Sequence, residues 1–509
     1  MPQERIRYAP LRDKISDPAT AARHVVDGSN LFVSGFSPVG YPKLIPAELA
    51  KRAASGERLR FNLYSGASTG DDLDGVLAEA GVVIWRRPYM AAKAMRQRIN
   101  QGEILFKDDH LSFTSAQVRS GGLGRVDVAV VEALAINEKG HLIPTMSVGN
   151  TPTFVRQADK IIIEMSDACP LDLEGIHDIY IPEDPPYRMP IPIYRASDRI
   201  GKPYIEMDPH KVVAIVYSQE RDHCPLFPPP DRVAHDIAAH ILDFVQHEIK
   251  AGRLPRGLPW QSGVGDVANA VLLGFLENDF FHGLDLYSEV LQDAVLDLLD
   301  LGKVRHASGS ALTFSTKGQD RFIKELYRYK EKVVLRPVEI SNSPEVIRRL
   351  GVLAVNTALE IDIYGHVNST HLWGRELMNG IGGSGDFVRN AALSFMVTPA
   401  SGKQERISRI VPMVSHVDHS EHSVDVVVTE HGLVDLRNRA PRQAARAIID
   451  HCAAPAYRDL LSDYLERASR AGGHEPQLLE EAFAFHLRYM QTGDMRPGGV
   501  PAAGRQRVD

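Results

Sequence analysis

A ten-residue pattern occurs twice in this chain of 509 residues, and it restricts the possible folds more than any other feature. Ala-Leu-Ala-Ile-Asn-Glu-Lys-Gly-His-Leu at 133–142 matches Ala-Leu-Glu-Ile-Asp-Ile-Tyr-Gly-His-Val at 358–367, 225 positions later. The shared form is A-L-x-I-x-x-x-G-H-apolar. The repeat indicates that the chain consists of two related halves. A site for a small ligand would then be expected in the cleft between them.

Short apolar runs alternate with helical patterns in both halves. The runs predicted as strands lie at 31–36, 59–64, 126–131 and 160–164, and then at 284–290, 332–335, 352–355, 407–411 and 424–428. Helical patterns include 231–249, 442–452, 456–468 and 477–489. Apolar runs separated by helices favour a largely parallel sheet that is covered on both faces. We therefore expect an α/β fold with two similar open domains and the active site in the cleft between them.

A run of three prolines marks the expected boundary between the domains. Residues 228–230 are Pro-Pro-Pro, and such a run fits neither a helix interior nor a central strand. We therefore predict an N-terminal α/β domain over residues 1–224 and a C-terminal α/β domain over residues 225–490. Residues 491–509 are rich in Gly, Pro and Ala, and we expect them to form a flexible tail.

Composition excludes several classes of function. The net charge is −7, with acids and bases mixed along the chain, so neither a nucleic-acid partner nor a membrane partner is expected. Cys169, Cys224 and Cys452 show no CxxC spacing, which argues against a zinc knuckle or a disulfide scaffold. The charged residues at 1–7 and the lack of an apolar run of about 18 residues predict neither a secretory leader nor a spanning helix. These features predict a cytoplasmic location.

The segment 283–290 is the most informative for chemistry. It is predicted to be a short strand that ends beside a single carboxylate, Glu289, and a helical pattern follows directly over 290–299. The junction between a strand and a helix is where α/β enzymes tend to place reactive groups. The alternative is an ordinary glutamate on a solvated rim. We favour a nucleophile because glycine-rich segments lie on both sides of Glu289 in the sequence.

Both glycine segments could present backbone N–H groups to a ligand. The segment 262–265, Ser-Gly-Val-Gly, precedes a helical pattern, which suits a phosphate or an oxyanion, although it can equally be a structural turn. It is not a GxGxxG motif, because Ala268 occupies the third glycine position. The segment 380–385 holds four glycines in six positions, so close approach of the backbone to a ligand is expected. Ser384 or Asp386 could cap a helix predicted at 387–394.

Other catalytic arrangements find less support in the sequence. The cluster His416-Val417-Asp418-His419-Ser420-Glu421-His422 could hold a metal ion, but it joins two predicted strands and contains no HExxH motif. We expect a polar loop there and no catalytic metal. A Gly-x-Ser-x-Gly motif is absent as well. A carboxylate nucleophile, by contrast, is already ionised at neutral pH and needs only donors that stabilise the oxyanion formed on attack.

Motifs spread over the chain carry a resemblance to a known family. They include Ser34-Gly35-Phe36, Gly66-Ala67-Ser68-Thr69-Gly70, Glu174-Gly175-Ile176-His177-Asp178, Gln261-Ser262-Gly263-Val264-Gly265, Tyr287-Ser288-Glu289-Val290, Ser341-Asn342-Ser343-Pro344 and Met378-Asn379-Gly380-Ile381-Gly382-Gly383-Ser384-Gly385-Asp386-Phe387. On these motifs the chain resembles the acetyl-CoA hydrolase/transferase family of class I CoA-transferases. The resemblance runs from about residue 4 to residue 490.

The resemblance implies a homodimer that transfers coenzyme A by a ping-pong mechanism. Glu289 would be the nucleophile that carries CoA as a glutamyl thioester. Asn342 would orient the acyl carbonyl, and the Gly383 N–H would stabilise the oxyanion. The resemblance places CoA against Gly263, Val264, Gly265, Asp266, Val267, Leu359, Asn379, Gly383 and Lys403, and it places Arg221 and Glu430 near a pocket for the substrate carboxylate. Coenzyme A would enter as a substrate, and no permanently bound cofactor is implied.

Three hypotheses about function follow from these observations. The first is a CoA-transferase acting between succinyl-CoA or acetyl-CoA and acetate, propionate or succinate. The second is a short-chain acyl-CoA hydrolase that uses the same glutamate, and the third is a homologue that binds acyl-CoA without catalysis. The chain departs from the family in one respect, because members often carry Asn where Asp266 stands. If that side chain contacted CoA phosphate, the extra negative charge would weaken binding.

Overall fold

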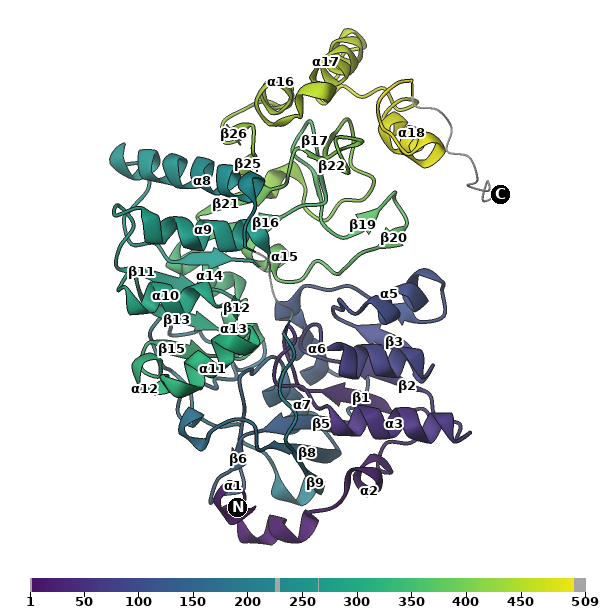
Figure 1. Cartoon of the computed structure of the whole chain (residues 1–509), viewed down its shortest axis with the longest axis vertical. Helices are drawn as coiled ribbons and strands as arrows, with labels where there is room; N and C mark the ends of the chain where they lie inside the picture. Colours follow the sequence, from purple (N-terminus) through teal and green to yellow (C-terminus); the bar gives the residue numbers. More distant parts are fainter. Residues whose placement is uncertain (1, 225–228, 264, 499–509) are drawn as a thin grey trace.

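The computed structural model describes residues 2–224, 229–263 and 265–498. Val264, part of the predicted linker and the end of the predicted tail therefore lie outside the described residues. Figure 1 shows two α/β halves side by side, the first in purple and blue and the second in teal and green. Helices α16 to α18 extend the second half at the end of the molecule opposite the N-terminus.

The first half contains a parallel sheet of seven strands in the order β4-β3-β2-β1-β5-β8-β9. All six residues of its interior strand β5 are buried, as expected for a strand covered on both faces. The strands are β1 (Asn30–Val33), β2 (Phe61–Tyr64), β3 (Val83–Arg87), β4 (Leu105–Phe106), β5 (Val128–Ala133), β8 (Lys160–Ser166) and β9 (Val212–Ser218).

The second half repeats this topology in the order β15-β13-β11-β10-β16-β21-β25-β26. The first seven strands are parallel, and β26 is added antiparallel to β25. In both halves the chain builds one side of the sheet outward from the centre and then returns to build the other side. The predicted α/β fold of two similar halves is therefore confirmed. The strands are β10 (Trp260–Ser262), β11 (Leu284–Tyr287), β13 (Val304–Gly309), β15 (Val333–Leu335), β16 (Leu353–Thr357), β21 (Leu393–Val397), β25 (Val426–Thr429) and β26 (Gly432–Asp435).

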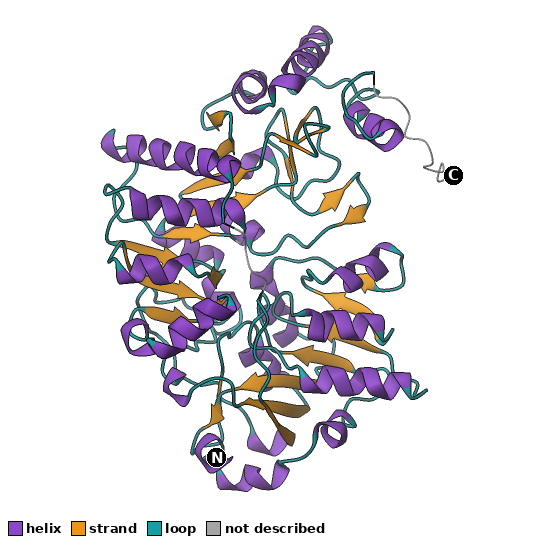
Figure 2. Ribbon diagram, viewed as in Figure 1, coloured by secondary structure: helices purple, strands orange, loops and turns teal. Residues whose placement is uncertain are grey.

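Helices cover the faces of both sheets (Figure 2). The longest, α8, begins after Asp231, whose side chain accepts a hydrogen bond from Ala234 N–H and caps the helix as predicted. In the described part of the chain, no helix combines the length and apolar character needed to cross a bilayer. The helices are α1 (Pro2–Arg5), α2 (Pro18–Ala22), α3 (Leu44–Ala54), α4 (Val76–Glu79), α5 (Lys93–Asn100), α6 (Thr114–Arg119), α7 (Thr151–Gln157), α8 (Arg232–Lys250), α9 (Asp266–Glu277), α10 (Ala294–Asp300), α11 (Thr316–Lys324), α12 (Leu326–Tyr329), α13 (Val338–Ser341), α14 (Pro344–Leu350), α15 (Ser384–Val388), α16 (Pro441–Cys452), α17 (Pro455–Arg470) and α18 (Ala484–Thr492).

The ten-residue repeat of the sequence forms the same antiparallel hairpin twice. The first hairpin is β6 (Ala135–Ile136) with β7 (Leu142–Ile143), and the second is β17 (Glu360–Asp362) with β18 (Val367–Asn368). Asn137 Oδ1 accepts from the N–H groups two and four residues later, and Asp362 Oδ1 does the same in the second hairpin. Each turn is therefore closed by a short polar side chain, and the glycine that both copies share, Gly140 or Gly365, adopts the positive φ that favours glycine.

Several predicted boundaries were wrong, two of them next to the candidate site. Residues after Glu289 form a short strand, β12 (Val290–Leu291), which pairs with β14 (Ala311–Leu312), and α10 begins only at Ala294. The helix expected at 387–394 is instead α15, over Ser384–Val388. The predicted strand at 407–411 is divided into β23 (Ile407–Ser408) and β24 (Ile410–Val411), and the last helix begins at Ala484 rather than near 477. The pairing of β12 with β14, which local patterns do not encode, decided the first of these boundaries.

Candidate active site

A cavity of about 420 Å³ lies between the two halves. The first half contributes loops that follow its strands, and the second half contributes Glu289 and most of the glycine loop 380–385. The lining residues are Ser37, Pro38, Ala67, Ser68, Tyr89, Ala91, Leu111, Gly263, Glu289, Thr313, Asn356, Thr357, Ala358, Leu359, Ser369, Asn379, Gly380, Ile381, Gly382, Gly383 and Ser384. Because both halves form the walls, a ligand here would contact both.

Glu289 lies between β11 and β12, at the carboxyl end of the sheet. Its neighbour Ser288 is fixed twice, because its N–H donates to Ser308 O at 2.9 Å and its Oγ donates to Ser262 O at 3.0 Å. The Glu289 carbonyl accepts from Ser310 N–H at 2.7 Å. The backbone on both sides of this residue is therefore held, while its side chain lines the cavity.

Two neutral donors contact the Glu289 carboxylate. Asn342 Nδ2 donates to Glu289 Oε2 at 3.0 Å, and the Gly383 N–H donates as well. Burial raises the pKa of Glu289, and these two hydrogen bonds oppose that shift. A Cβ at position 383 would collide with Glu289 Oε2 and Asn342 Nδ2, so only glycine allows this close approach.

The first half of the chain holds the glycine loop 380–385 in place. Asp108 Oδ2 accepts from Ile381 N–H at 2.6 Å, and Asp108 and Tyr89 occupy the space that a Cβ on Gly380 would need. Burial raises the pKa of Asp108 to about 7, and the bond from Ile381 opposes the shift. Within the second half, Ser384 Oγ donates to Ile381 O at 2.7 Å. The loop that supplies the Gly383 N–H is therefore anchored from both halves.

Comparisons with known proteins agree with this arrangement. A family model described as the acetyl-CoA hydrolase/transferase N-terminal domain matches residues 1–217, and the corresponding C-terminal domain model matches residues 318–465. A succinyl-CoA:acetate CoA-transferase of Clostridium kluyveri is 46% identical over 497 residues, which cover 97% of this chain and 92% of that protein. The chain belongs to the acetyl-CoA hydrolase/transferase family.

Two further comparisons place the chain within the breadth of the acetyl-CoA hydrolase/transferase family. An acetyl-CoA hydrolase of Schizosaccharomyces pombe is 43% identical over 512 residues, which cover 97% of this chain and 98% of that protein. The crystal structure of RipA from Yersinia pestis superposes with a TM-score of 0.70 at 21% identity and covers 90% of this chain and 98% of that chain. Relatives with similar identity to this chain are therefore named as transferases and as hydrolases. The superposition with RipA shows that the two proteins share a fold.

The structure brings together only part of the CoA site that the family resemblance implied. Gly263, Leu359, Asn379 and Gly383 line the cavity beside Glu289. The remaining described positions of the first glycine segment, Gly265, Asp266 and Val267, lie at the start of α9 and are not among the lining residues. The Asp266 side chain is exposed, so its charge faces solvent. Val264 lies outside the described residues.

Three other predicted residues lie away from the cavity lining. Lys403 is exposed in the turn between β22 (Ser401–Gly402) and β23, and its Nζ donates to Tyr489 Oη at 2.7 Å. Arg221 forms an ion pair with Asp320 of α11 at 2.8 Å. Glu430 accepts from Ala400 N–H at 2.8 Å. The predicted carboxylate pocket of Arg221 and Glu430 is therefore not assembled beside Glu289, because each side chain is engaged elsewhere.

The histidine cluster 416–422 is divided among separate partners. His416 pairs with Asp418 at 3.3 Å, whereas His419 Nε2 contacts Ser384 Oγ at 3.1 Å on the glycine loop. Burial lowers the pKa of His419 to about 4, so this imidazole is neutral near pH 7. No three His, Cys, Asp or Glu side chains among the described residues are grouped so that they could hold a metal ion.

The sequence did not identify Tyr89 or Asp108 as site residues. Tyr89 follows β3 and packs against Gly380 and Gly382, and Asp108 follows β4. Both belong to the first half and reach the site only because the two sheets face each other across the cavity. The single available signal was the polar turn Lys107-Asp108-Asp109-His110 at the end of a strand, which is too common to single out.

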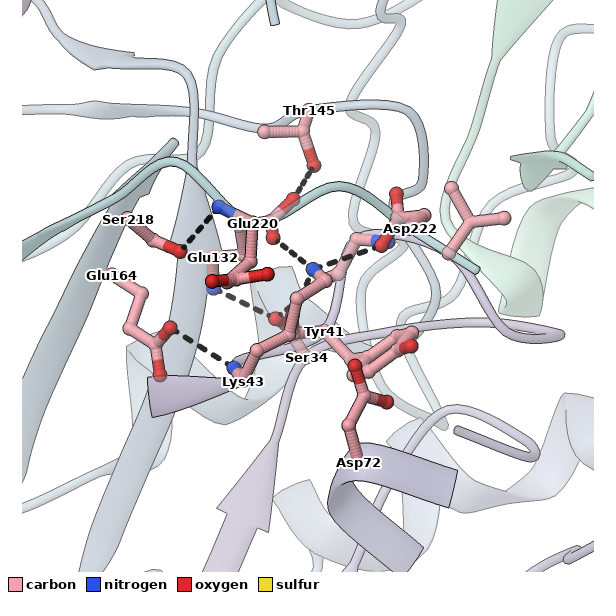
Figure 3. Close-up of polar contacts among 12 residues, drawn as sticks. Ser34, Tyr41, Lys43, Asp72, Glu132, Thr145, Glu164, Ser218, Glu220 and Asp222 are labelled. Carbon is pink, nitrogen blue, oxygen red and sulfur yellow. Dashed lines mark hydrogen bonds and ion pairs between the residues drawn. The ribbon is translucent and has the colours of Figure 1, made fainter. Parts of the chain in front are cut away.

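A buried ion network fixes the wall that the first half contributes. Lys43 Nζ contacts Glu132 at 2.6 Å and Asp222 at 2.9 Å, and all three side chains are almost fully enclosed (Figure 3). Asp222 also accepts from Gly40 N–H. The loop that Lys43 and Asp222 hold carries Ser37 and Pro38 to the cavity. Burial lowers the pKa of Lys43, but Asp222 and Glu132 more than compensate and raise it above its ordinary range.

Proposed function

We propose that the protein is a CoA-transferase that moves CoA between an acyl-CoA and a short-chain carboxylate through a glutamyl–CoA thioester on Glu289. One observation supports this most directly. A carboxylate on the cavity wall is contacted by an amide N–H and a backbone N–H, and no side-chain base among the described residues bonds to it. A nucleophile that is ionised without a helper base requires this arrangement.

The first half-reaction loads the enzyme in two steps. A Glu289 oxygen attacks the thioester carbonyl carbon of the acyl-CoA, the C–S bond breaks, and CoA leaves as the thiolate, giving an acyl–glutamyl anhydride. The thiolate sulfur then attacks the Glu289 carbonyl carbon, the anhydride C–O bond breaks, and the acyl group leaves as a carboxylate. Gly383 N–H and Asn342 Nδ2 are placed to stabilise the oxyanion formed on the Glu289 carbonyl.

The second half-reaction runs these steps in reverse with a new carboxylate. The acceptor oxygen attacks the glutamyl thioester, the released thiolate attacks the acyl carbonyl of the new anhydride, and Glu289 returns as a carboxylate. No net proton is gained or lost, and water takes no part. The chemistry therefore needs only a positioned carboxylate, oxyanion donors and a cavity that both substrates enter in turn.

The neutral cavity wall bears on the choice of acyl group. Among the described lining residues, Glu289 is the single charged side chain, and none is cationic. A second carboxylate, as in a succinyl group, would therefore be held by a neutral donor such as the Ser68 hydroxyl. Acetyl and propionyl groups need no such partner. We propose that these short monocarboxylates are accepted together with succinate, and that a substrate panel will rank them.

Hydrolysis is the second candidate, because a relative of 43% identity is named an acetyl-CoA hydrolase. In that reaction water would attack either Glu289 intermediate in place of the acceptor. Following acetyl-CoA consumption with and without succinate or acetate separates the two functions. A transferase consumes acetyl-CoA only when the acceptor is present. Equal rates without an acceptor would establish the hydrolase and reject the transferase.

Covalent trapping tests the intermediate itself. Borohydride added in the presence of acyl-CoA should reduce a glutamyl thioester to an alcohol, which lowers the mass of the peptide that contains Glu289. An unmodified peptide under turnover conditions would contradict the proposal and would favour a homologue that binds acyl-CoA without catalysis. The homodimer stays a prediction of the family resemblance, and the cytoplasmic location stays a prediction from the composition.

A further inference from the structure

Asp386 is a buried acid to which the mechanism above assigns no role. It lies in α15, three residues after Gly383, and its side chain is only 2% exposed. Its carboxylate accepts from Ser112 N–H at 3.1 Å and from Ser112 Oγ at 2.6 Å. The third donor is Asn342 Nδ2 at 3.3 Å. Asp386 does not line the cavity, so any effect on the reaction passes through Asn342.

The Asn342 amide is fully buried and has a partner for every polar atom. Its Oδ1 accepts from Ser341 Oγ at 2.8 Å. Its Nδ2 carries two hydrogens, which point to Glu289 Oε2 at 3.0 Å and to Asp386 Oδ2 at 3.3 Å. The opposite orientation of the amide would direct Oδ1 at two carboxylates and lose both bonds. Asp386 and Ser341 therefore define which way the amide faces.

We propose that Asp386 is a positioning residue that keeps one N–H of Asn342 directed at Glu289 through every covalent state of the transfer. The proposal rests on the function proposed above. While Glu289 is ionised, its charge alone would attract the Asn342 N–H. Once Glu289 is an anhydride or a thioester, its carbonyl is neutral and a weaker acceptor. The bond to Asp386 then keeps the amide from turning away before the oxyanion forms.

Asp386 also connects Asn342 and Glu289 to the first half of the chain. Ser112 belongs to the short helix η3 (Leu111–Phe113), whose Leu111 lines the cavity. A continuous path of hydrogen bonds thus runs from Ser112 through Asp386 and Asn342 to Glu289. Burial raises the pKa of Asp386 to about 7, against the opposing bonds from Ser112. In either protonation state one oxygen is free to accept from Asn342, so an asparagine at this position should serve almost as well.

A double-mutant cycle tests whether Asp386 acts through Asn342. We expect Asp386→Ala to lower kcat about 100-fold, as misplacement of a catalytic group by about 1 Å can do, with the KM for acyl-CoA changed less than about threefold. In an Asn342→Ala background the same substitution should have almost no further effect, because residues that act as a unit are not additive. Asp386→Asn should restore kcat to within about fivefold of wild type, since it retains an acceptor for the amide.

Asp425 provides the matched control, because it also accepts from both the N–H and the Oγ of a single serine, Ser394, at 2.8 and 3.1 Å. It does not line the cavity, so Asp425→Ala should leave kcat per folded molecule unchanged in both backgrounds.

Additive losses for Asp386→Ala and Asn342→Ala, or an unchanged kcat in Asp386→Ala, would overturn the inference. If Asp386→Ala does not fold, Asp386→Ser, whose hydroxyl is too short to reach the amide, takes its place. A wild-type enzyme without a borohydride-trapped adduct would instead overturn the proposed function, and this inference with it.

Discussion

Equivalent strands of the two halves, β2 and β11, lead toward the cavity, but different residues follow them. The second strand outward from the centre ends in Leu-Tyr-Ser-Gly at 63–66 in the first half and in Leu-Tyr-Ser-Glu at 286–289 in the second. In both, the serine N–H donates to the neighbouring strand, from Ser65 to Arg87 O at 3.2 Å and from Ser288 to Ser308 O at 2.9 Å. The backbone is thus repeated, and the residue that follows the serine is not.

The space around that last residue explains the difference. A Cβ on Gly66 would lie 2.6 Å from Gly35 O and close to Gly149 Cα, so the first half leaves no room for a side chain. Glu289 instead opens onto the cavity. The duplicated sheet supplies two equivalent positions, and only one of them can hold a nucleophile. The first half contributes walls and anchors, such as Asp108 and Ser112, that hold parts of the second half.

The two halves also treat a buried glutamate differently. Burial raises the pKa of Glu132 in the first half, but Lys43 lies 2.6 Å away and opposes the shift. Within the described part of the chain, Glu289 receives hydrogen bonds from neutral donors alone. A carboxylate that is paired with an ammonium group is a weak nucleophile, whereas one that is held by N–H groups keeps its charge available for attack. Structural and reactive carboxylates are therefore distinguished by their partners rather than by their burial.

Replacing Glu289 should have the largest effect of any single change. We expect Glu289→Ala to reduce kcat at least about 10⁴-fold, because it removes the group that becomes covalently loaded. Glu289→Asp should lose about 100-fold, since the carboxylate is drawn back by one methylene. Acyl-CoA consumption in the presence of an acceptor carboxylate measures both. Asp285→Ala on the same strand, whose carboxylate pairs with Arg305 at 3.0 Å, is the matched control.

Moving the carboxylate to the equivalent position of the first half should not restore activity. In the double variant Gly66→Glu/Glu289→Gly, the new side chain has no space beside Gly35 O. We expect a protein of lowered stability and no transfer. Recovery of activity in this variant would show that the halves are interchangeable and would contradict the steric argument.

Breaking the ion network of the first half should cost stability rather than chemistry. Lys43→Met leaves Glu132 and Asp222 buried without their cation, which should lower the free energy of unfolding by about 3–5 kcal/mol. Urea denaturation followed by circular dichroism measures the loss. The more exposed pair Lys51–Glu48, 2.6 Å apart, is the control, and Lys51→Met should cost at most about 1 kcal/mol. Equal losses would mean that enclosure of the Lys43 network is irrelevant.

Adding a methyl group at Gly383 should affect the chemistry directly. The new Cβ would occupy space that now belongs to Glu289 Oε2 and Asn342 Nδ2, so the oxyanion donors would be displaced. We expect Gly383→Ala to lower kcat by about 10²–10³-fold, as loss of one oxyanion donor does. Gly122→Ala is the control, because a Cβ there meets its nearest neighbour at an ordinary 3.4 Å. A Gly383→Ala enzyme of normal kcat would show that the added methyl group does not displace the donors, and it would contradict the steric argument.

The sequence predicted what local patterns encode. Burial on both faces made β5 and β8 visible as apolar runs, and the capping side chain of Asp231 marked the start of α8. Glu289 and the 380–385 loop were found because a carboxylate at a strand end and a cluster of glycines are local features. The repeat at 133–142 and 358–367 predicted two halves because both copies keep the glycine that the turn requires and a short polar side chain, Asn137 or Asp362, that closes it.

What the sequence could not predict depends on contacts between distant segments. Asp386 was interpreted as a possible helix cap, yet its partners are Ser112 and Asn342, 274 and 44 positions away. The start of α10 was placed too early because nothing local shows that β12 pairs with β14. Arg221 and Glu430 were assigned to the site by resemblance alone, and each side chain has a closer partner elsewhere. Such partners become known only when the two sheets are placed face to face.

The pH dependence of the reaction gives the finest comparison of the two buried glutamates. Burial raises the pKa of Glu289 above its ordinary value of 4.5, and attack requires the ionised form, so kcat/KM should fall as the pH drops through that raised pKa. Below it the loss is about tenfold per pH unit.

Asn342→Ala removes a bond that lowers the pKa of Glu289, so its acid limb should move to higher pH. Glu132→Gln should leave the limb in place, because Glu132 titrates beside Lys43 and away from the cavity lining. The opposite result would be an acid limb that moves in Glu132→Gln and stays fixed in Asn342→Ala. It would assign the essential ionisation to Glu132 in the first half and would contradict the role given to Glu289.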